Sequence, residues 1–262
     1  MNLNPLKRLG FSLILLAPAL VFSACAGAGK KSANELRNHK TLAASYARGG
    51  DFIGAIKEVD MAGKQAEGDP EAHLIKGIAY FGLKDLQAAE RSYKKALEIK
   101  SDYTKARYNL CGLYLKMNNP DGAIEHCKVA AHDLTYPLRY AALVNIAKAH
   151  MLKNDTASAE RFFAKSIKLE PSNIYSRNEY GKLLQGLSRH SEAIKQFQAA
   201  LRIAPGYNKA RLNLALALMK AGNRETACSE VKKILRNKPR PAIAALVEKH
   251  TEKICAVQRN AN

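Results

Sequence analysis

Small and bulky apolar residues recur along this chain with a period of about 34 residues. Six alanines mark the same point in successive periods: Ala55, Ala89, Ala123, Ala159, Ala193 and Ala227. A bulky or apolar residue usually follows four positions after each alanine, and a small residue stands twelve positions before it. Because residues four apart share one face of a helix, each period predicts two helices joined by a short turn.

The small positions indicate that the two helices of each period approach closely, with a ring or an aliphatic side chain filling the gap beside them. This pattern resembles the tetratricopeptide repeat, a helix-turn-helix unit of 34 residues. The resemblance covers residues 36–240, which is six repeats. Because one unit cannot bury its apolar face alone, we expect an all-α superhelix with a concave face. Residues 241–257 predict a further amphipathic helix, so that residues 241–262 form a capping helix and tail.

The third repeat is two residues longer than its neighbours, around Tyr136 and Pro137. Proline cannot extend the preceding helix, and it biases the residue before it toward extended geometry. We therefore expect a break between the third and fourth repeats. The pattern alone leaves open whether this break is only a tolerated loop insertion.

The N-terminus has the layout of a sorting signal. Two basic residues precede an apolar run of about 16 residues, 9–24, whereas a membrane-spanning helix needs roughly 20. The sequence FSAC at residues 22–25 resembles the bacterial lipobox, whose cysteine is lipidated and then exposed by cleavage. We expect a signal peptide over residues 1–24, a lipidated Cys25 and a short tether over residues 25–35. Ala26 in place of an aspartate indicates the periplasmic face of the outer membrane. An ordinary secretory signal or a buried helix are the alternatives.

The chain is strongly basic, with a formal net charge of +19. This much positive charge attracts polyanions. For a secreted lipoprotein these are lipopolysaccharide, acidic lipid head groups and cell-wall carboxylates, and no nucleic acid is expected as a partner. A solvated basic surface without a dedicated ligand is the alternative.

Six repeats behind a lipobox resemble the type IV pilus biogenesis lipoproteins of the PilF, PilW and Tgl family. The segment between the third and fourth repeats strengthens the resemblance, because those proteins carry an Asp, a Tyr-Pro pair and an Asn-bearing helix there. In this chain the matching residues are Asp133, Tyr136, Pro137 and Asn145. The resemblance implies a pilotin, which binds the pilus secretin subunit, takes it to the outer membrane and promotes ring assembly.

The first helix of each repeat is expected to line the concave face and to supply the protein-binding residues. The apolar members of this set are Leu74, Ile78, Phe81, Tyr108 and Leu115, with Val144 and Met151 beside them. Three amides, Asn109, Asn145 and Asn213, could pair with the backbone of an extended peptide, since an amide both donates and accepts. The alternatives are that a loop or the N-terminal tail covers the apolar strip and that the amides bond within the repeats. Nearby lysines at 105, 148, 182 and 209 could hold an acidic segment, or could simply be solvated.

Four cysteines follow Cys25, and an oxidising compartment allows disulfides. Cys228 and Cys255 would meet if the capping helix packs antiparallel to the last repeat helix, so we predict this bridge, with separate thiols as the alternative. Cys111 and Cys127 occupy facing core positions of one repeat, and we favour buried thiols there because helix spacing rarely suits a bridge.

No sequence motif for catalysis, nucleotide binding or zinc binding is present, so we expect neither an enzyme nor a cofactor. Two functions remain open. One is a pilus-secretin assembly factor that grips its partner in the concave face. The other is a structural lipoprotein whose basic charge tethers the outer membrane to the cell wall or to an acidic surface polymer. The sequence leaves the oligomeric state open.

Overall fold

The computed structural model describes residues 19–236, 239 and 241–255, except for the side chains of residues 19–32 and 242. Within these residues every regular element is a helix, and the chain divides into two compact units at Ser101 and Asp102. Residues 1–18 of the predicted signal peptide (1–24) and the side chain of Cys25, the predicted lipidation site, lie outside this description.

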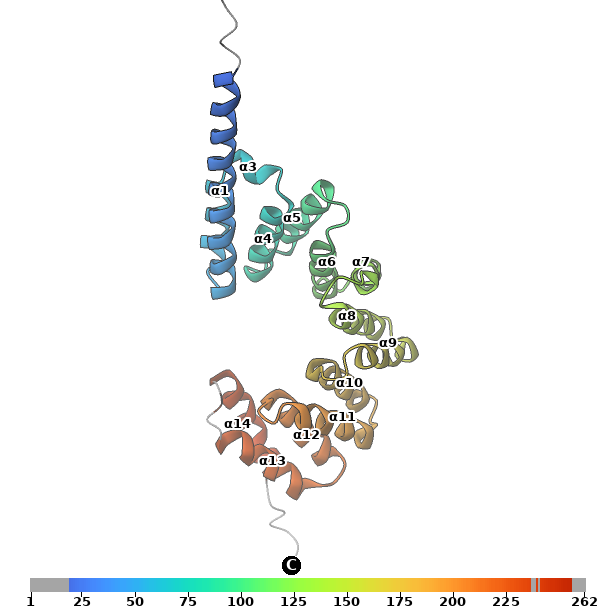
Figure 1. Cartoon of the computed structure of the whole chain (residues 1–262). Helices are drawn as coiled ribbons and strands as arrows, with labels where there is room; N and C mark the ends of the chain where they lie inside the picture. The colour runs from blue at the N-terminus through green and yellow to red at the C-terminus, as the bar shows by residue number, and fades with distance from the viewer. Residues whose placement is uncertain (1–18, 237–238, 240, 256–262) are drawn as a thin grey trace, which may run out of the picture. The chain divides into compact units, whose positions relative to one another are not determined.

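Unit 1 contains five helices in its described part (Figure 1). They are α1 (Ala19–Gly49), α2 (Phe52–Met61), the short α3 (Lys64–Glu67), α4 (Pro70–Gly82) and α5 (Leu86–Ile99). The helices pair as hairpins, with α1 packed on α2 and α4 packed on α5. These two hairpins correspond to the first two predicted repeats.

Unit 2 contains nine helices in its described part. They are α6 (Thr104–Lys116), α7 (Pro120–His132), α8 (Arg139–Leu152), α9 (Thr156–Leu169), α10 (Ile174–Gly186), α11 (His190–Ile203), α12 (Asn208–Lys220), α13 (Arg224–Arg236) and α14 (Pro241–Cys255). The first eight form four hairpins. The last helix, α14, is the predicted capping helix, and it packs on α13 and α12. Figure 1 shows α8, α10, α12 and α14 along one side of this unit, with α9, α11 and α13 on the other.

The turn inside each hairpin has the same construction in every repeat. One residue adopts a positive φ, and these residues are Gly50, Lys84, Asn118, Asn154, Ser188 and Gly222. In five turns the next side chain caps the second helix by accepting from a backbone N–H three residues on; these caps are Asp51, Asp85, Asn119, Asp155 and Asn223. The repeat period therefore includes a helix-start signal as well as the apolar pattern.

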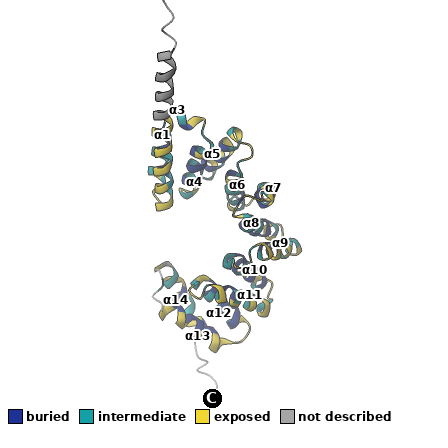
Figure 2. Ribbon diagram, viewed as in Figure 1, coloured by how far each residue is buried: buried dark blue, intermediate teal, exposed yellow. Residues whose placement is uncertain are grey.

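Small residues let the paired helices approach closely, as the sequence predicts. A Cβ placed on Gly77 would lie 2.4 Å from the ring of Tyr93, and one on Gly181 would lie 2.5 Å from the ring of Phe197. Tyr93 and Phe197 are fully buried by this packing. Figure 2 shows buried residues on the paired helices of both units. A glycine opposite a ring thus builds the core of each of these hairpins.

The third repeat places two cysteines at the same pair of positions, and there the expectation of free thiols is wrong. Cys111 and Cys127 form a disulfide with a Cα–Cα distance of 5.3 Å. The reason is the close approach at this small-and-bulky pair, which brings the two backbones within the range that a disulfide needs. A second disulfide joins Cys228 to Cys255 with a Cα–Cα distance of 5.0 Å, and it fastens the end of α14 to α13.

Candidate functional site

A pocket of about 420 Å³ lies between α10, α12 and α14 in unit 2. Its lining combines aromatic and aliphatic side chains with amides, a carboxylate and lysines: Tyr175, Asn178, Glu179, Lys182, Tyr207, Lys209, Leu212, Asn213, Ile243 and Leu246. The first helices of two repeats and the capping helix all contribute. An apolar wall with a few polar groups is the usual composition of a binding site.

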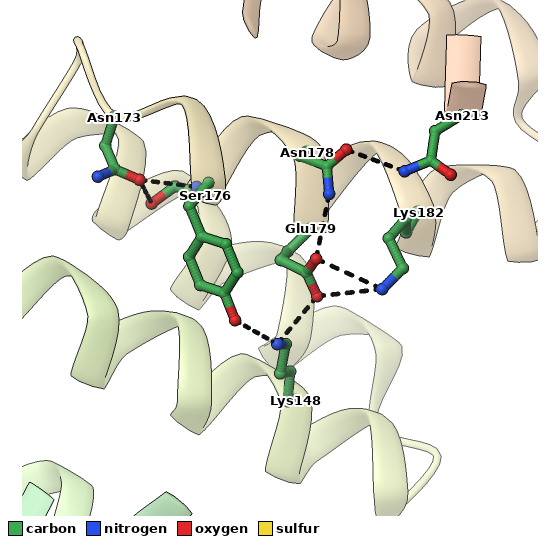
Figure 3. A network of polar contacts seen from close by, with 8 residues as sticks. Lys148, Asn173, Ser176, Asn178, Glu179, Lys182 and Asn213 are labelled. Carbon is green, nitrogen blue, oxygen red and sulfur yellow. Dashed lines mark hydrogen bonds and ion pairs between the residues drawn. The ribbon is translucent and has the colours of Figure 1, made fainter. Parts of the chain in front are cut away.

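Glu179 is the centre of the polar contacts in this pocket, as Figure 3 shows. Its carboxylate lies 2.9 Å from Nζ of Lys148 on α8 and 3.3 Å from Nζ of Lys182 one turn further along α10. Lys148 also donates to the hydroxyl of Tyr175 at 2.6 Å, and its ammonium group lies 4.9 Å from the centre of that ring. Glu179 is only 8% exposed, so its charge is compensated within the protein.

The surroundings of Glu179 and Lys148 stabilise both charges. Burial is the largest influence on Glu179 and opposes its ionisation, but Lys148 and Lys182 together outweigh it and hold the pKa of Glu179 below its usual range. Burial likewise opposes the charge on Lys148, yet Tyr175 and Glu179 together raise its pKa. The pocket therefore has a fixed ion pair in one wall at neutral pH.

Two amides continue this network toward α12. Asn213 donates to the side-chain oxygen of Asn178 at 2.9 Å, and Asn178 donates to Glu179 at 3.1 Å. These bonds hold Asn213 in one orientation at the pocket. Figure 3 draws no bond to the carbonyl oxygen of Asn213, and Lys209 adds an exposed positive charge to the pocket lining.

Of the residues that the sequence offers for partner binding, Asn213 and the lysines Lys182 and Lys209 line this pocket. Asn109 donates to the carbonyl oxygen of Lys105 within its own helix at 2.8 Å, and Asn145 bonds to Tyr108. Asn109 is thus occupied within its own repeat, as the alternative interpretation describes, whereas the bond of Asn145 joins the third and fourth repeats. Asn178 and Glu179 are pocket residues that the sequence argument did not select, although they follow from counting the same inward helix positions in the fifth repeat.

The predicted apolar strip is divided between the two units. In unit 1, Phe81 is 38% exposed and Ile78 is half-buried, whereas Leu74 is 6% exposed because α4 packs against α1 and α2 as well as α5. Leu74 therefore offers little surface to a partner. In unit 2, Tyr108 and Leu115 are half-buried on α6.

The break between the third and fourth repeats is a tightly bonded loop. Asp133 accepts hydrogen bonds from the hydroxyl of Thr104 and from the backbone and hydroxyl of Thr135, and these bonds lower the pKa of Asp133. The ring of Tyr136 is buried against Tyr108, with centroids 5.6 Å apart. Leu134 is 80% exposed at the tip of this loop. Contacts with Thr104 and Tyr108 of α6 therefore hold the inserted segment in place within unit 2.

The described part of the chain has neither a metal-binding cluster nor a membrane-spanning helix. It contains no group of three or more His, Cys, Asp or Glu residues placed to hold a metal ion. None of the described helices is both long enough and apolar enough to cross a membrane.

Solved structures with a similar fold include proteins of pilus assembly. PilF of Pseudomonas aeruginosa has a TM-score of 0.67 at 18% identity, and the match covers 84% of this chain and 99% of that one. PilW, described as a widely conserved type IV pilus biogenesis factor, has a TM-score of 0.71 at 22% identity, with 80% and 97% covered. At this identity the likeness shows the fold.

Curated relatives match only part of this chain. Protein FlbA of Caulobacter vibrioides is 25% identical over 176 residues, which is 67% of this chain and 29% of that protein. The chain spans less than a third of the length of the curated relatives that it matches.

Family assignment follows from the repeat sequence itself. Sequence models described as tetratricopeptide repeat match residues 41–104, 80–135, 140–173 and 184–249, which together take in most of both units. The hairpins, the close small-and-bulky pairs and the stacked order agree with these matches. The chain belongs to the tetratricopeptide repeat proteins, which bind protein partners.

Proposed function

We propose that this chain is a pilotin, an outer-membrane lipoprotein that binds the type IV pilus secretin subunit from the periplasmic side and promotes its targeting and multimerisation. The main support for the proposal is the pocket between α10, α12 and α14. The fold, which resembles those of PilF and PilW, is the second support. The lipobox-like sequence ending at Cys25 supports the location.

The chemistry of the pocket suits a segment of polypeptide. The side chain of Asn213 is oriented to meet a peptide backbone, and Leu212, Ile243 and Leu246 provide an apolar wall for a neighbouring side chain. Leu246 is 46% exposed, so it has surface to lose to a partner. Lys182 and Lys209 favour an acidic group in the bound segment.

A binding experiment with purified secretin subunit tests this proposal. Leu246→Ser should weaken binding by about three- to tenfold, because burying a whole leucine contributes roughly 1.5–3 kcal/mol and Leu246 has about half of its surface left to bury. Val129→Ser on α7 is the matched control, since Val129 is 43% exposed and lies outside the pocket. Phe81→Ser tests whether unit 1 contributes as well. Leu74→Ser is unsuitable because that side chain is buried.

The cellular test is the amount of heat-resistant secretin multimers in outer membranes. Deleting the gene should remove these multimers, and Leu246→Ser should reduce them more than Val129→Ser does. Normal multimers in the deletion strain would sink the pilotin proposal.

A second function is favoured by the net charge of +19. A basic lipoprotein could tether the outer membrane to cell wall or acidic polymer without any groove. Such binding would collapse by about 0.3 M salt, because exposed charges are then strongly screened. Binding in the pocket should persist at that salt concentration, since apolar contact supplies part of it.

A further inference from the structure

The second helices of unit 2 carry positive charges at matching positions. Ser166, Ala200 and Ile234 are buried at one point of α9, α11 and α13. Two residues further on, about 200° round each helix, stand Lys168, Arg202 and Arg236, all exposed. We call these three cations the outer row. Because the positions differ by one repeat length, they face the same side of the stacked hairpins.

More cations surround the outer row. Arg161, Lys165, Lys195 and Lys232 are exposed on the same three helices. Within the described residues, none of these seven cations forms an ion pair with a carboxylate. Lys148 and Lys182, by contrast, both lie within ion-pair distance of the single carboxylate of Glu179. Exposed cations without an ion pair therefore lie along α9, α11 and α13, which Figure 1 places on the other side of unit 2 from α10 and α12.

Each member of the outer row has an exposed aliphatic neighbour. Leu169 follows Lys168 and is 40% exposed, Ile203 follows Arg202 and is 44% exposed, and Leu235 precedes Arg236 and is 36% exposed. Exposed aliphatic side chains also occur elsewhere in the described chain, but here one stands beside a cation in each of three repeats. A membrane interface uses both, because head groups attract the cations and the acyl boundary accepts the aliphatic groups.

We propose that the outer row and its aliphatic neighbours dock unit 2 on an anionic lipid surface. The ligand class is the phosphate-bearing head group of a phospholipid bilayer. Docking through α9, α11 and α13 would leave the pocket on the other side open to a partner. The proposal stands independently of the identity of that partner.

Vesicle sedimentation with the full chain tests the proposal, using phosphatidylcholine vesicles with and without about 30% phosphatidylglycerol at about 50 mM NaCl. Any apolar contribution of the N-terminal segment is common to both vesicle types, so the ratio of affinities isolates the charge effect. The wild-type chain should prefer the anionic vesicles by about tenfold or more, and this preference should fall as salt rises.

Three variants distinguish the contributions. The charge variant K168E/R202E/R236E should lose the preference for anionic vesicles. The aliphatic variant L169S/I203S/L235S should bind those vesicles severalfold more weakly while keeping the salt dependence. The control K105E/K116E/K220E changes net charge equally at exposed positions on α6 and α12, and it should keep the preference. Circular dichroism checks that all variants are folded.

Two outcomes would overturn the proposal. One is equal binding by the charge variant and the control, which would mean that net charge alone acts. The other is an aliphatic variant that binds anionic vesicles like wild type while soluble heparin competes fully, which would identify a general polyanion surface.

Discussion

Glu179 shows what a single residue does in this repeat stack. Its carboxylate joins α8 to α10 through Lys148 and, by way of Asn178, leads on to Asn213 of α12. The repeat pattern predicts that position 179 faces inward. It does not identify Lys148, 31 positions earlier in the chain, as the partner, because that contact depends on how two helices pack.

The lowered pKa of Glu179 predicts a pH dependence. A carboxyl whose pKa falls on folding contributes stability above its unfolded pKa of about 4.5, and this contribution is lost as the pH falls through the folded value. Glu179→Gln should therefore lower stability at about pH 7, and its deficit should shrink toward about pH 3. Urea unfolding at several pH values measures this difference.

Glu225→Gln is the control for the pH experiment, because Glu225 is exposed on α13. It should follow the wild-type profile. A Glu179→Gln deficit that stays constant from neutral to acid pH would show that the ion pairs of Glu179 do not stabilise the fold.

At the scale of helices, the capping helix α14 couples stability to the proposed binding site. Ile243 and Leu246 of α14 form part of the pocket wall, and Cys255 at its end is bonded to Cys228. The sequence predicts α14 from its amphipathic pattern and its place after the last repeat. Its role in a pocket appears only once it packs on α12 and α13.

Removing this disulfide should loosen α14 and weaken the pocket. Cys228→Ser with Cys255→Ser should lower stability by about 2–4 kcal/mol, because the bridge restricts the unfolded chain. Amide hydrogen exchange in α14 should accelerate, and binding of the secretin subunit should fall with it. The measurements are exchange detected by mass spectrometry and binding under the same buffer conditions.

The other disulfide provides the control. The variant C111A/C127V introduces the small-and-bulky combination that Ala215 and Val231 already form in the last repeat. It should leave exchange in α14 unchanged. Equal protection of α14 with and without the Cys228–Cys255 bond would contradict this account of the capping helix.

At the scale of the whole molecule, unit 2 separates two kinds of surface. One side holds the pocket with the Lys148–Glu179 ion pair in its wall, and the other holds the outer row, whose three cations form no ion pair. A net charge of +19 says nothing about this division, since composition carries no direction. The division arises because alternate helices of the repeats face opposite sides of the stack.

This separation predicts that the two proposed activities are independent. Leu246→Ser should keep the preference for anionic vesicles, and K168E/R202E/R236E should keep the affinity for the secretin subunit. A variant that combines Leu246→Ser with K168E/R202E/R236E should lose both the affinity for the secretin subunit and the preference for anionic vesicles. Each loss should equal that of the separate variant, because distant sites rarely couple. A charge variant that binds the subunit as weakly as Leu246→Ser would show instead that the surfaces act together.

The amino-acid sequence by itself determined the helical hairpins, their period and their small-and-bulky core pairs, because these depend on spacings within one or two helices. Tertiary structure decided the burial of Leu74, the Cys111–Cys127 bond, the Lys148–Glu179 pair and the pocket beside α14. The physical reason is that the spacing of apolar residues along the sequence determines only the direction in which each side chain points from its helix. The distance to the neighbouring helix, on which bonds and cavities depend, is set by packing.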